Sequence, residues 1–203
     1  MRTLRFLFLS LVMIPFLSFS QSMENLDYIS PFQNGMAAVK KDNQWAFINT
    51  KGDVVINFRA DIAISELEGK NYPVFADDRC LIVEQKNGIS YFGFIDKTGN
   101  TVVEPKFLNA TNFYNGQAIA LELLKEVVGE NKALNKTVSY DKYLEAVIDT
   151  NGNVLGYLSP KRTNVILDKK FLRCPPKISA KHISDNLFAF LNDDNTWSII
   201  SIE

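Results

Sequence analysis

The single histidine, His182, is the first residue of this sequence that could support catalysis. A Ser-His-Asp triad needs a histidine as its base, and Asp185 lies close to His182 in the chain. No Gly-x-Ser-x-Gly signature of a nucleophile occurs, and the surrounding stretch is rich in lysine. These observations favour an exposed loop histidine over a catalytic base.

Two pairs of neighbouring acids could act as general acid and base or as calcium ligands. Asp77-Asp78 and Asp193-Asp194 both fall at expected turns, where aspartate is common because its side chain binds its own backbone. Residues 149–153 begin like a calcium loop but lack the closing glutamate. The sequence therefore points to no catalytic residue, no metal site and no cofactor, and to a protein that is not an enzyme.

The two cysteines leave two interpretations open. Cys80 occupies an apolar position of a predicted strand, which favours a buried thiol. Cys174 lies before two prolines in a predicted loop. In an oxidising compartment the two cysteines could instead form a disulfide.

The composition excludes several classes of protein. With 46% hydrophobic and 22% charged residues in a chain of 203, the sequence is that of a folded protein rather than a disordered one. The 22 basic and 23 acidic residues are balanced, which argues against nucleic-acid binding. One histidine and two cysteines exclude zinc fingers and dense disulfide frameworks.

The N-terminus has the pattern of a signal peptide. Arg2 and Arg5 precede a mostly apolar run, residues 6–19, and Ser18 and Ser20 are the small residues expected before cleavage at Gln21. A membrane anchor is the alternative, but a spanning helix needs about 20 apolar residues. We therefore expect export to the periplasm or the medium, without stable membrane insertion after cleavage.

The rest of the chain repeats one turn. The pattern of an apolar pair, Asp or Asn, two polar residues, Gly, Asp or Asn and an apolar residue occurs in residues 47–55, 94–102 and 147–155. Each stretch predicts a β-hairpin turn in which Gly supplies the positive φ angle. Gly52, Gly99 and Gly152 lie at intervals of 47 (99 − 52) and 53 (152 − 99) residues, which is typical of a repeat architecture.

Two further patterns flank these turns. Each tetrapeptide at 45–48, 92–95, 145–148 and 197–200 has a small second residue, against which we expect a backbone or an aromatic ring to pack. The stretches 32–35, 75–78, 113–116 and 183–186 each precede an apolar strand. The expected strands are residues 36–39, 80–83, 118–121 and 187–191.

The combined pattern resembles the WG-repeat proteins of bacteria. An aromatic residue, two variable residues and Gly come first, followed by an apolar strand, a polar turn and Trp-small-aromatic-Ile-Asp. The resemblance covers most of residues 32–203, but Phe92-Gly93 has Phe in place of Trp, and Glu145 replaces an aromatic residue. It implies a β-rich repeat protein, often exported, and supplies no catalytic residue.

Four aromatic residues could form a platform for stacking sugars: Trp45, Tyr91, Phe92 and Trp197. Trp45, Phe92 and Trp197 recur at one position of the repeat. Repeat proteins keep such positions for packing between neighbouring units. We therefore expect these aromatic side chains in the core.

Three inserts distinguish the units: residues 61–72, 122–143 and 159–181. The second could be a short helix or a lengthened hairpin, and the sequence favours the hairpin, with arms at 118–128 and 137–148 and a turn at 129–132. The third contains three prolines and is predicted to be mostly loop.

These observations predict an all-β fold of three to four antiparallel, three-stranded repeat units, arranged as an open array or a curled sheet. A signal peptide (1–20) and an N-terminal lead (21–30) precede the repeat domain (31–203). Its units are expected at about 31–70, 71–109, 110–158 and 182–203. The expected function is an exported, non-enzymatic interaction module that binds an envelope protein or a glycan through its inserts. The alternative is a hydrolase of cell-envelope polysaccharide that uses acids in the turns.

Overall fold

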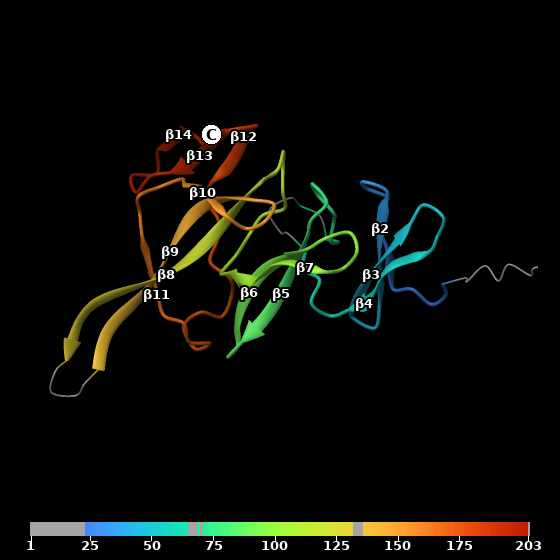
Figure 1. Cartoon of the computed structure of the whole chain (residues 1–203), viewed down its shortest axis with the longest axis horizontal. Helices are drawn as coiled ribbons and strands as arrows, with labels where there is room; N and C mark the ends of the chain where they lie inside the picture. The colour runs from blue at the N-terminus through green and yellow to red at the C-terminus, as the bar shows by residue number, and fades with distance from the viewer. Residues whose placement is uncertain (1–22, 65–68, 70, 132–135, 203) are drawn as a thin grey trace, which may run out of the picture.

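The computed structural model describes residues 23–64, 69, 71–131 and 136–202 and shows a chain of antiparallel sheets (Figure 1). The predicted signal peptide, residues 1–20, lies outside the described residues. Within the described ranges, no helix has the length and apolar character needed to cross a membrane.

Fourteen strands form four sheets in the described part of the chain. The first sheet contains β1 (Tyr28–Ile29), β2 (Met36–Lys41), β3 (Gln44–Asn49) and β4 (Val54–Arg59). The second contains β5 (Cys80–Lys86), β6 (Ile89–Ile95) and β7 (Thr101–Phe107). The third contains β8 (Gln117–Asn131), β9 (Lys136–Asp149), β10 (Val154–Tyr157) and β11 (Thr163–Val165). The fourth contains β12 (Lys181–Ser184), β13 (Leu187–Leu191) and β14 (Trp197–Ser201).

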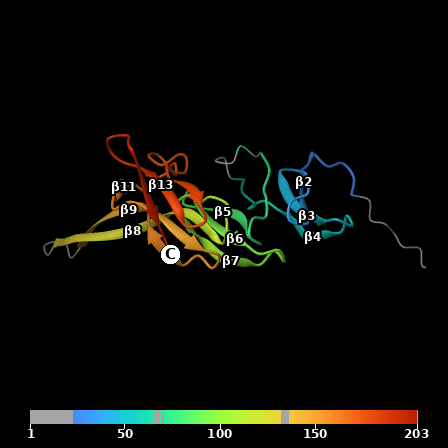
Figure 2. The same ribbon diagram turned by 90° about the horizontal axis from the view of Figure 1, so that it is seen from above.

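The predicted all-β repeat fold is confirmed, and the open array is the arrangement adopted. The first sheet lies at one end of the molecule, the second lies next to it, and the third and fourth lie toward the other end (Figures 1 and 2). In the described residues, the first and last strands of each sheet order do not pair with each other.

The repeated turns have the predicted chemistry. The side-chain oxygen of Asn49 accepts hydrogen bonds from the backbone N–H groups of Lys51 (2.9 Å) and Asp53 (3.0 Å). Gly52 has a φ angle of +86°, a conformation that glycine adopts without steric cost. Asp96 and Asp149 accept equivalent backbone hydrogen bonds in the next two turns.

The expected close approach to the small-residue position is confirmed at Gly93 in β6. A Cβ atom there would lie 2.2 Å from the carbonyl oxygen of Val103 and 2.7 Å from the nitrogen of Pro105. Both neighbours are backbone atoms of β7. The register between β6 and β7 shifts on both sides of Phe94, which lets β7 bend across Gly93.

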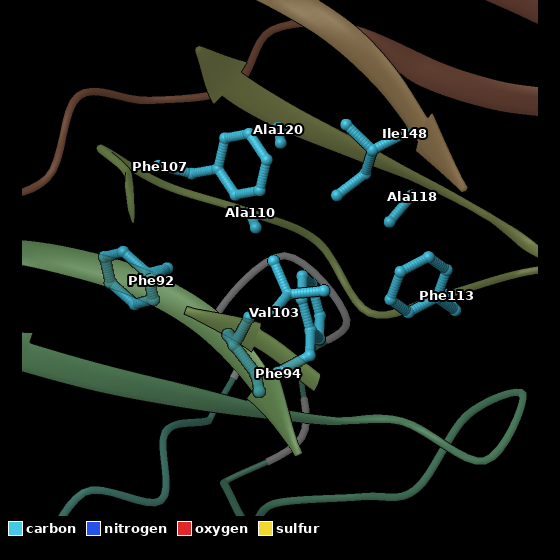
Figure 3. Packing of buried hydrophobic residues seen from close by; sticks show 10 residues of the cluster. Phe92, Phe94, Val103, Phe107, Ala110, Phe113, Ala118, Ala120 and Ile148 are labelled. Atoms are coloured by element: carbon cyan, nitrogen blue, oxygen red, sulfur yellow. The ribbon is translucent and has the colours of Figure 1, made fainter. Parts of the chain in front are cut away.

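The hydrophobic core lies between neighbouring sheets. Figure 3 shows one such cluster, in which Phe94 of the second sheet meets Phe113, which precedes the third sheet, with ring centroids 4.7 Å apart. Phe47 and Phe75 make the same contact between the first and second sheets, also at 4.7 Å. Each sheet therefore buries apolar area against the next one, as expected of stacked repeats.

The insert at 122–143 forms a lengthened hairpin, as predicted, and the helix alternative is wrong. The turn expected at 129–132 is also wrong for residues 129–131, because β8 continues to Asn131 and pairs there with Lys136. Residues 132–135 lie outside the described part of the chain. The third insert is mostly irregular, as predicted, but contains β11, which pairs with β9.

Candidate binding surface

The paired ends of β8 and β9 project beyond the rest of the molecule as a two-stranded ribbon (Figures 1 and 2). We call this part, residues 126–131 and 136–140, the ribbon. Its register is regular from Gln117↔Asp149 outward, with one shift between Val127 and Gly129. The shift makes Val128 an extra residue on β8, a β-bulge.

Four apolar side chains of the ribbon are exposed: Val127, Val128, Val138 and Tyr140. Their exposed fractions lie between 44% and 63%. The sequence predicts the insert as a binding element without singling out these side chains. The feature of the sequence that could have identified them is the pair of adjacent valines, Val127 and Val128, in a lengthened hairpin.

The ribbon also presents unpaired strand edges. In the proximal part of β8, Leu121 exchanges backbone hydrogen bonds with the segment at Leu108 and Asn109, at 3.0 and 2.8 Å. On the far side of β9, β11 pairs as far as Asp141. Among the described residues, no further strand pairs with either edge beyond these points. Open edges can accept an additional strand from another chain.

Polar contacts hold the base of the ribbon. Lys142 on β9 forms an ion pair with Glu126 on β8 at 2.5 Å, and Arg162 lies 4.0 Å from the same carboxylate. The hydrogen bond from Lys142 lowers the pKa of Glu126 below its ordinary value. Nearby, the hydroxyl of Tyr157 donates to Glu122 at 2.6 Å. These contacts fix the direction in which the ribbon leaves the third sheet.

His182 does not lie in an exposed loop, so that prediction is wrong. It belongs to β12 and is half-buried, with its ring 4.3 Å from the ring of Phe188 and 5.6 Å from that of Tyr114. Neither ring nitrogen has a hydrogen-bond partner among the described residues, and Asp185 instead accepts a hydrogen bond from Asn115. Desolvation lowers the pKa of His182. The arrangement is that of a packed aromatic ring rather than of a catalytic triad.

The first acidic pair belongs to a turn between sheets. Asp77 and Asp78 both have positive φ angles. The Asp77 carboxylate accepts a hydrogen bond from the backbone N–H of Gly116 at 2.7 Å, and Asp78 forms an ion pair with Lys97 at 2.5 Å. Asp77 thus links the turns that open the second and third repeats.

The second acidic pair also makes turn contacts. Asp193 forms an ion pair with Lys161. The Asp194 carboxylate accepts hydrogen bonds from the Thr196 hydroxyl (2.6 Å) and backbone N–H (3.0 Å). These hydrogen bonds lower the pKa of Asp194, which stabilises the ionised carboxylate.

The calcium-like stretch at 149–153 is a closed Asx turn. The carboxylate of Asp149 accepts hydrogen bonds from the backbone N–H groups of Asn151 and Asn153, both at 2.9 Å. Desolvation raises the pKa of Asp149, but these hydrogen bonds and one from the Asn153 side chain lower it by more. Among the described residues, no group of three or more His, Cys, Asp or Glu side chains is placed to hold a metal ion.

The two cysteines are separate and free. Cys80 is fully buried in β5, as expected for an apolar repeat position, and its burial raises the pKa of the thiol. Cys174 is exposed in the third insert. The alternative disulfide between them is not formed.

Two segments of the chain, residues 25–45 and 92–121, match the model of the WG containing repeat family. These two segments carry the WG-containing repeat. Each match spans an aromatic-x-x-Gly turn and the apolar strand after it, β2 in the first and the start of β8 in the second. No curated protein and no solved structure gives a significant match.

The aromatic position of the WG repeats is only partly in the core. Phe92 is buried, and Trp45 is partly buried against the cluster that contains Phe47 and Phe75, as expected. Trp197 is exposed, so the expectation of burial is wrong there. Lys181 lies over its ring at 4.6 Å from the centroid. The exposed side chains of Trp197 and Ile199 show that this face of the fourth sheet is open to solvent.

Glu145 replaces an aromatic residue in the third WG repeat for a reason that the sequence does not reveal. Its carboxylate accepts hydrogen bonds from the backbone N–H of Ser179 (2.5 Å), the Ser179 hydroxyl (2.9 Å) and the backbone N–H of Ala180 (3.2 Å). The third insert therefore docks on Glu145 where another repeat would place an aromatic side chain.

Proposed function

We propose that this protein is an exported, non-enzymatic interaction module and that its ribbon binds a protein partner of the cell envelope. The observation that carries the proposal is the exposure of Val127, Val128, Val138 and Tyr140 on a projecting ribbon. Exposed apolar side chains gathered on one projecting element mark interaction surfaces in soluble proteins, and here both faces of the ribbon carry them, Val127 on one and Val138 and Tyr140 on the other. The first and second sheets form without such an insert, so the WG-repeat scaffold does not need the ribbon to fold.

The chemistry of the ribbon favours a protein over a glycan. A sugar-binding platform needs aromatic faces, and three of the four exposed apolar side chains are valines. The open edges of β8 and β9 instead offer backbone N–H and C=O groups to an extended peptide. A partner strand would gain backbone hydrogen bonds along the edge and apolar contacts with the valines.

The pKa values of the carboxyl groups in the turns favour a binding role over the alternative of a polysaccharide hydrolase. A glycosidase needs one carboxyl group whose pKa is raised, so that it can donate a proton. The pKa values of Asp149 and Asp194 are lowered instead, and the pKa of Asp96 is lowered chiefly by the hydrogen bond from the Thr98 side chain. These carboxylates contribute to turn structure rather than to proton transfer.

The experiment compares capture of envelope proteins by the wild-type chain and by three variants. The first variant replaces residues 127–139 with Asn-Gly, so that the hairpin closes on the Glu126↔Tyr140 pair and keeps the Lys142 ion pair. The second is Val127→Asp. The matched control, Ile166→Asp, places the same charge at an equally exposed position of the third insert.

We expect the wild type and Ile166→Asp to capture and crosslink to the same protein, and the two ribbon variants to lose it. A partner retained by both ribbon variants would contradict the proposal, and loss with Ile166→Asp alone would move the site to the third insert. Release of sugars from envelope polysaccharide would instead support the hydrolase. Export is tested separately by the intact mass of the protein from the envelope or medium, which should begin at Gln21.

A further inference from the structure

The same apolar contact joins the first sheet to the second and the second to the third. One partner is the third residue of the tetrapeptide at 45–48 or 92–95, Phe47 or Phe94, and we call the sheet face that carries it the receiving side. The other partner is the aromatic residue just before the first turn of the next repeat, Phe75 or Phe113, and we call the part of the repeat that carries it the inserting side. All four rings are buried, with at most 4% of their surface exposed.

The fourth sheet presents a receiving side without an inserted residue. Ile199 occupies the position of Phe47 and Phe94, yet 67% of its surface is exposed, compared with 1% for each of those rings. Trp197, on the same face of β14, is 48% exposed. Leu187 of β13 pairs with Ser201 on this face and is also exposed. An apolar face of β13 and β14 is thus open to solvent.

The first sheet presents an inserting side without a receiving face. Phe32 precedes the bridge Gln33↔Met36, just as Phe75 and Phe113 precede the equivalent bridges of their own repeats. Phe32 is 50% exposed. Ile29, which pairs with Val39 as Ile62 pairs with Ile82, is also exposed although Ile62 is buried.

The turn of the first repeat is open in the same way. A Cβ atom at Gly99 or Gly152 would touch a side chain of the preceding sheet, Ile56 or Val103. A Cβ atom at Gly52 would meet nothing within 4 Å. Within the described residues, the first sheet therefore lacks, at its turn as well as at Phe32, the neighbour that the second and third repeats have.

We propose that a second copy of this chain docks its first sheet on the fourth sheet, with Phe32 packed against Ile199 and Trp197. The occupant is inferred from continuity with the internal interfaces, because one chain carries both halves of a contact that it already makes twice. The first and fourth sheets lie toward opposite ends of the molecule (Figures 1 and 2), and the two surfaces differ from one another, so the contact is head-to-tail and can extend beyond a dimer. It does not involve the ribbon and is independent of the proposed function.

The contact between the third and fourth sheets shows how the repeat interface can be altered. Ile183 occupies the inserting position there but is exposed. Ile178 and Ala180 of the third insert instead join Val147 in one buried cluster. No insert covers Ile199 or Phe32 in the described part of the chain. Phe32 can therefore pack on Ile199 as Phe75 packs on Phe47.

Sedimentation velocity of the full chain across the micromolar range tests the proposal. We expect a mass that rises with concentration to at least twice that of one chain. Phe32→Asp and Ile199→Asp should each stay monomeric, because each places a charge in the apolar contact. Val127→Asp, which alters only the ribbon, should associate like the wild type.

Mixing the two monomeric variants gives the sharpest result. Phe32→Asp keeps an intact fourth sheet and Ile199→Asp keeps an intact first sheet, so their mixture should form dimers and nothing larger. A monomeric wild type, association lost with Val127→Asp but not with Ile199→Asp, or no dimers in the mixture would each overturn the proposal. If a charged variant fails to fold by circular dichroism, Phe32→Ser and Ile199→Thr replace the pair, with weakened association expected for each alone.

Discussion

The guanidinium group of Arg59, at the end of β4, donates a hydrogen bond to the carbonyl oxygen of Gly99 at 2.8 Å. Lys106 in β7 repeats this contact one unit further along, with Gly152 at 3.1 Å. The turn glycines are therefore docking points for the preceding sheet as well as sites of positive φ. The sequence explains these glycines by the positive φ angle of the turn alone. That explanation is incomplete, because it leaves out the hydrogen bonds between sheets.

Replacing Arg59 should loosen the first sheet from the second. Arg59→Ala removes the hydrogen bond to Gly99 and leaves Asp61 without its paired guanidinium. We expect a loss of about 1–2 kcal/mol in the free energy of unfolding. Hydrogen exchange should accelerate in β2, β3 and β4 more than in β8 and β9, because repeat units unfold with partial independence.

Arg59→Lys is the control for this prediction. Lys106 shows that an ammonium group can reach the turn carbonyl, so this variant should recover part of the protection in β2 to β4. Equal acceleration in all four sheets of the alanine variant would argue against a local inter-sheet role for Arg59.

Adding one methyl group at Gly93 should destabilise the second sheet. The new Cβ atom would overlap the β7 backbone at Val103 and Pro105, which cannot move aside as a side chain can. We expect Gly93→Ala to cost about 1–3 kcal/mol in urea unfolding. Gly129→Ala is the matched control, since a Cβ there meets no atom of the described residues within 4 Å, and its stability should equal or exceed that of the wild type.

Trp45 and Trp197 occupy the same repeat position but should respond differently to truncation. Trp45 is partly buried against the cluster that contains Phe47 and Phe75, and it meets Tyr28 edge-on with ring centroids 5.9 Å apart. Trp45→Ala should lower the free energy of unfolding by about 2–4 kcal/mol. Trp197→Ala should cost less than about 1 kcal/mol at concentrations where the chain is monomeric, because it loses mainly the contact with Lys181. Equal losses would show that Trp197 is as buried as Trp45.

His182 should make stability depend on pH near neutrality. Its pKa in the folded chain is lowered by burial, so below about pH 6.5 the unfolded chain binds the proton more strongly. Stability should therefore fall as the pH drops from about 7.5 to about 5.5. His182→Phe keeps an aromatic ring beside Phe188 but cannot bind the proton. The melting temperature of this variant should therefore fall less over the same pH range than that of the wild type. An identical pH dependence in both proteins would assign it to other groups.

The repeat architecture was readable because its signals are local. A glycine at positive φ and an Asn or Asp that binds the backbone two residues on, as at Asn49 and Gly52, need no long-range contact. The strands beginning at Met36 and Cys80 follow from apolar runs of a few residues. These features predict the hairpins and the all-β class from short stretches of sequence.

The surfaces depend on contacts between distant residues, and a repeat pattern is uninformative about those. Trp45 and Trp197 occupy the same position of the repeat, yet Trp45 is partly buried against a core cluster and Trp197 faces solvent, because burial depends on whether a neighbouring sheet is present. Glu145, which stands where other repeats have an aromatic residue, accepts hydrogen bonds from Ser179, which is 34 residues away in the chain. Hydrophobic burial is set by surroundings in three dimensions, whereas turn and strand preferences are set by the nearest few residues. The sequence therefore predicts the turns and strands, whereas the packing of the sheets decides which faces are exposed.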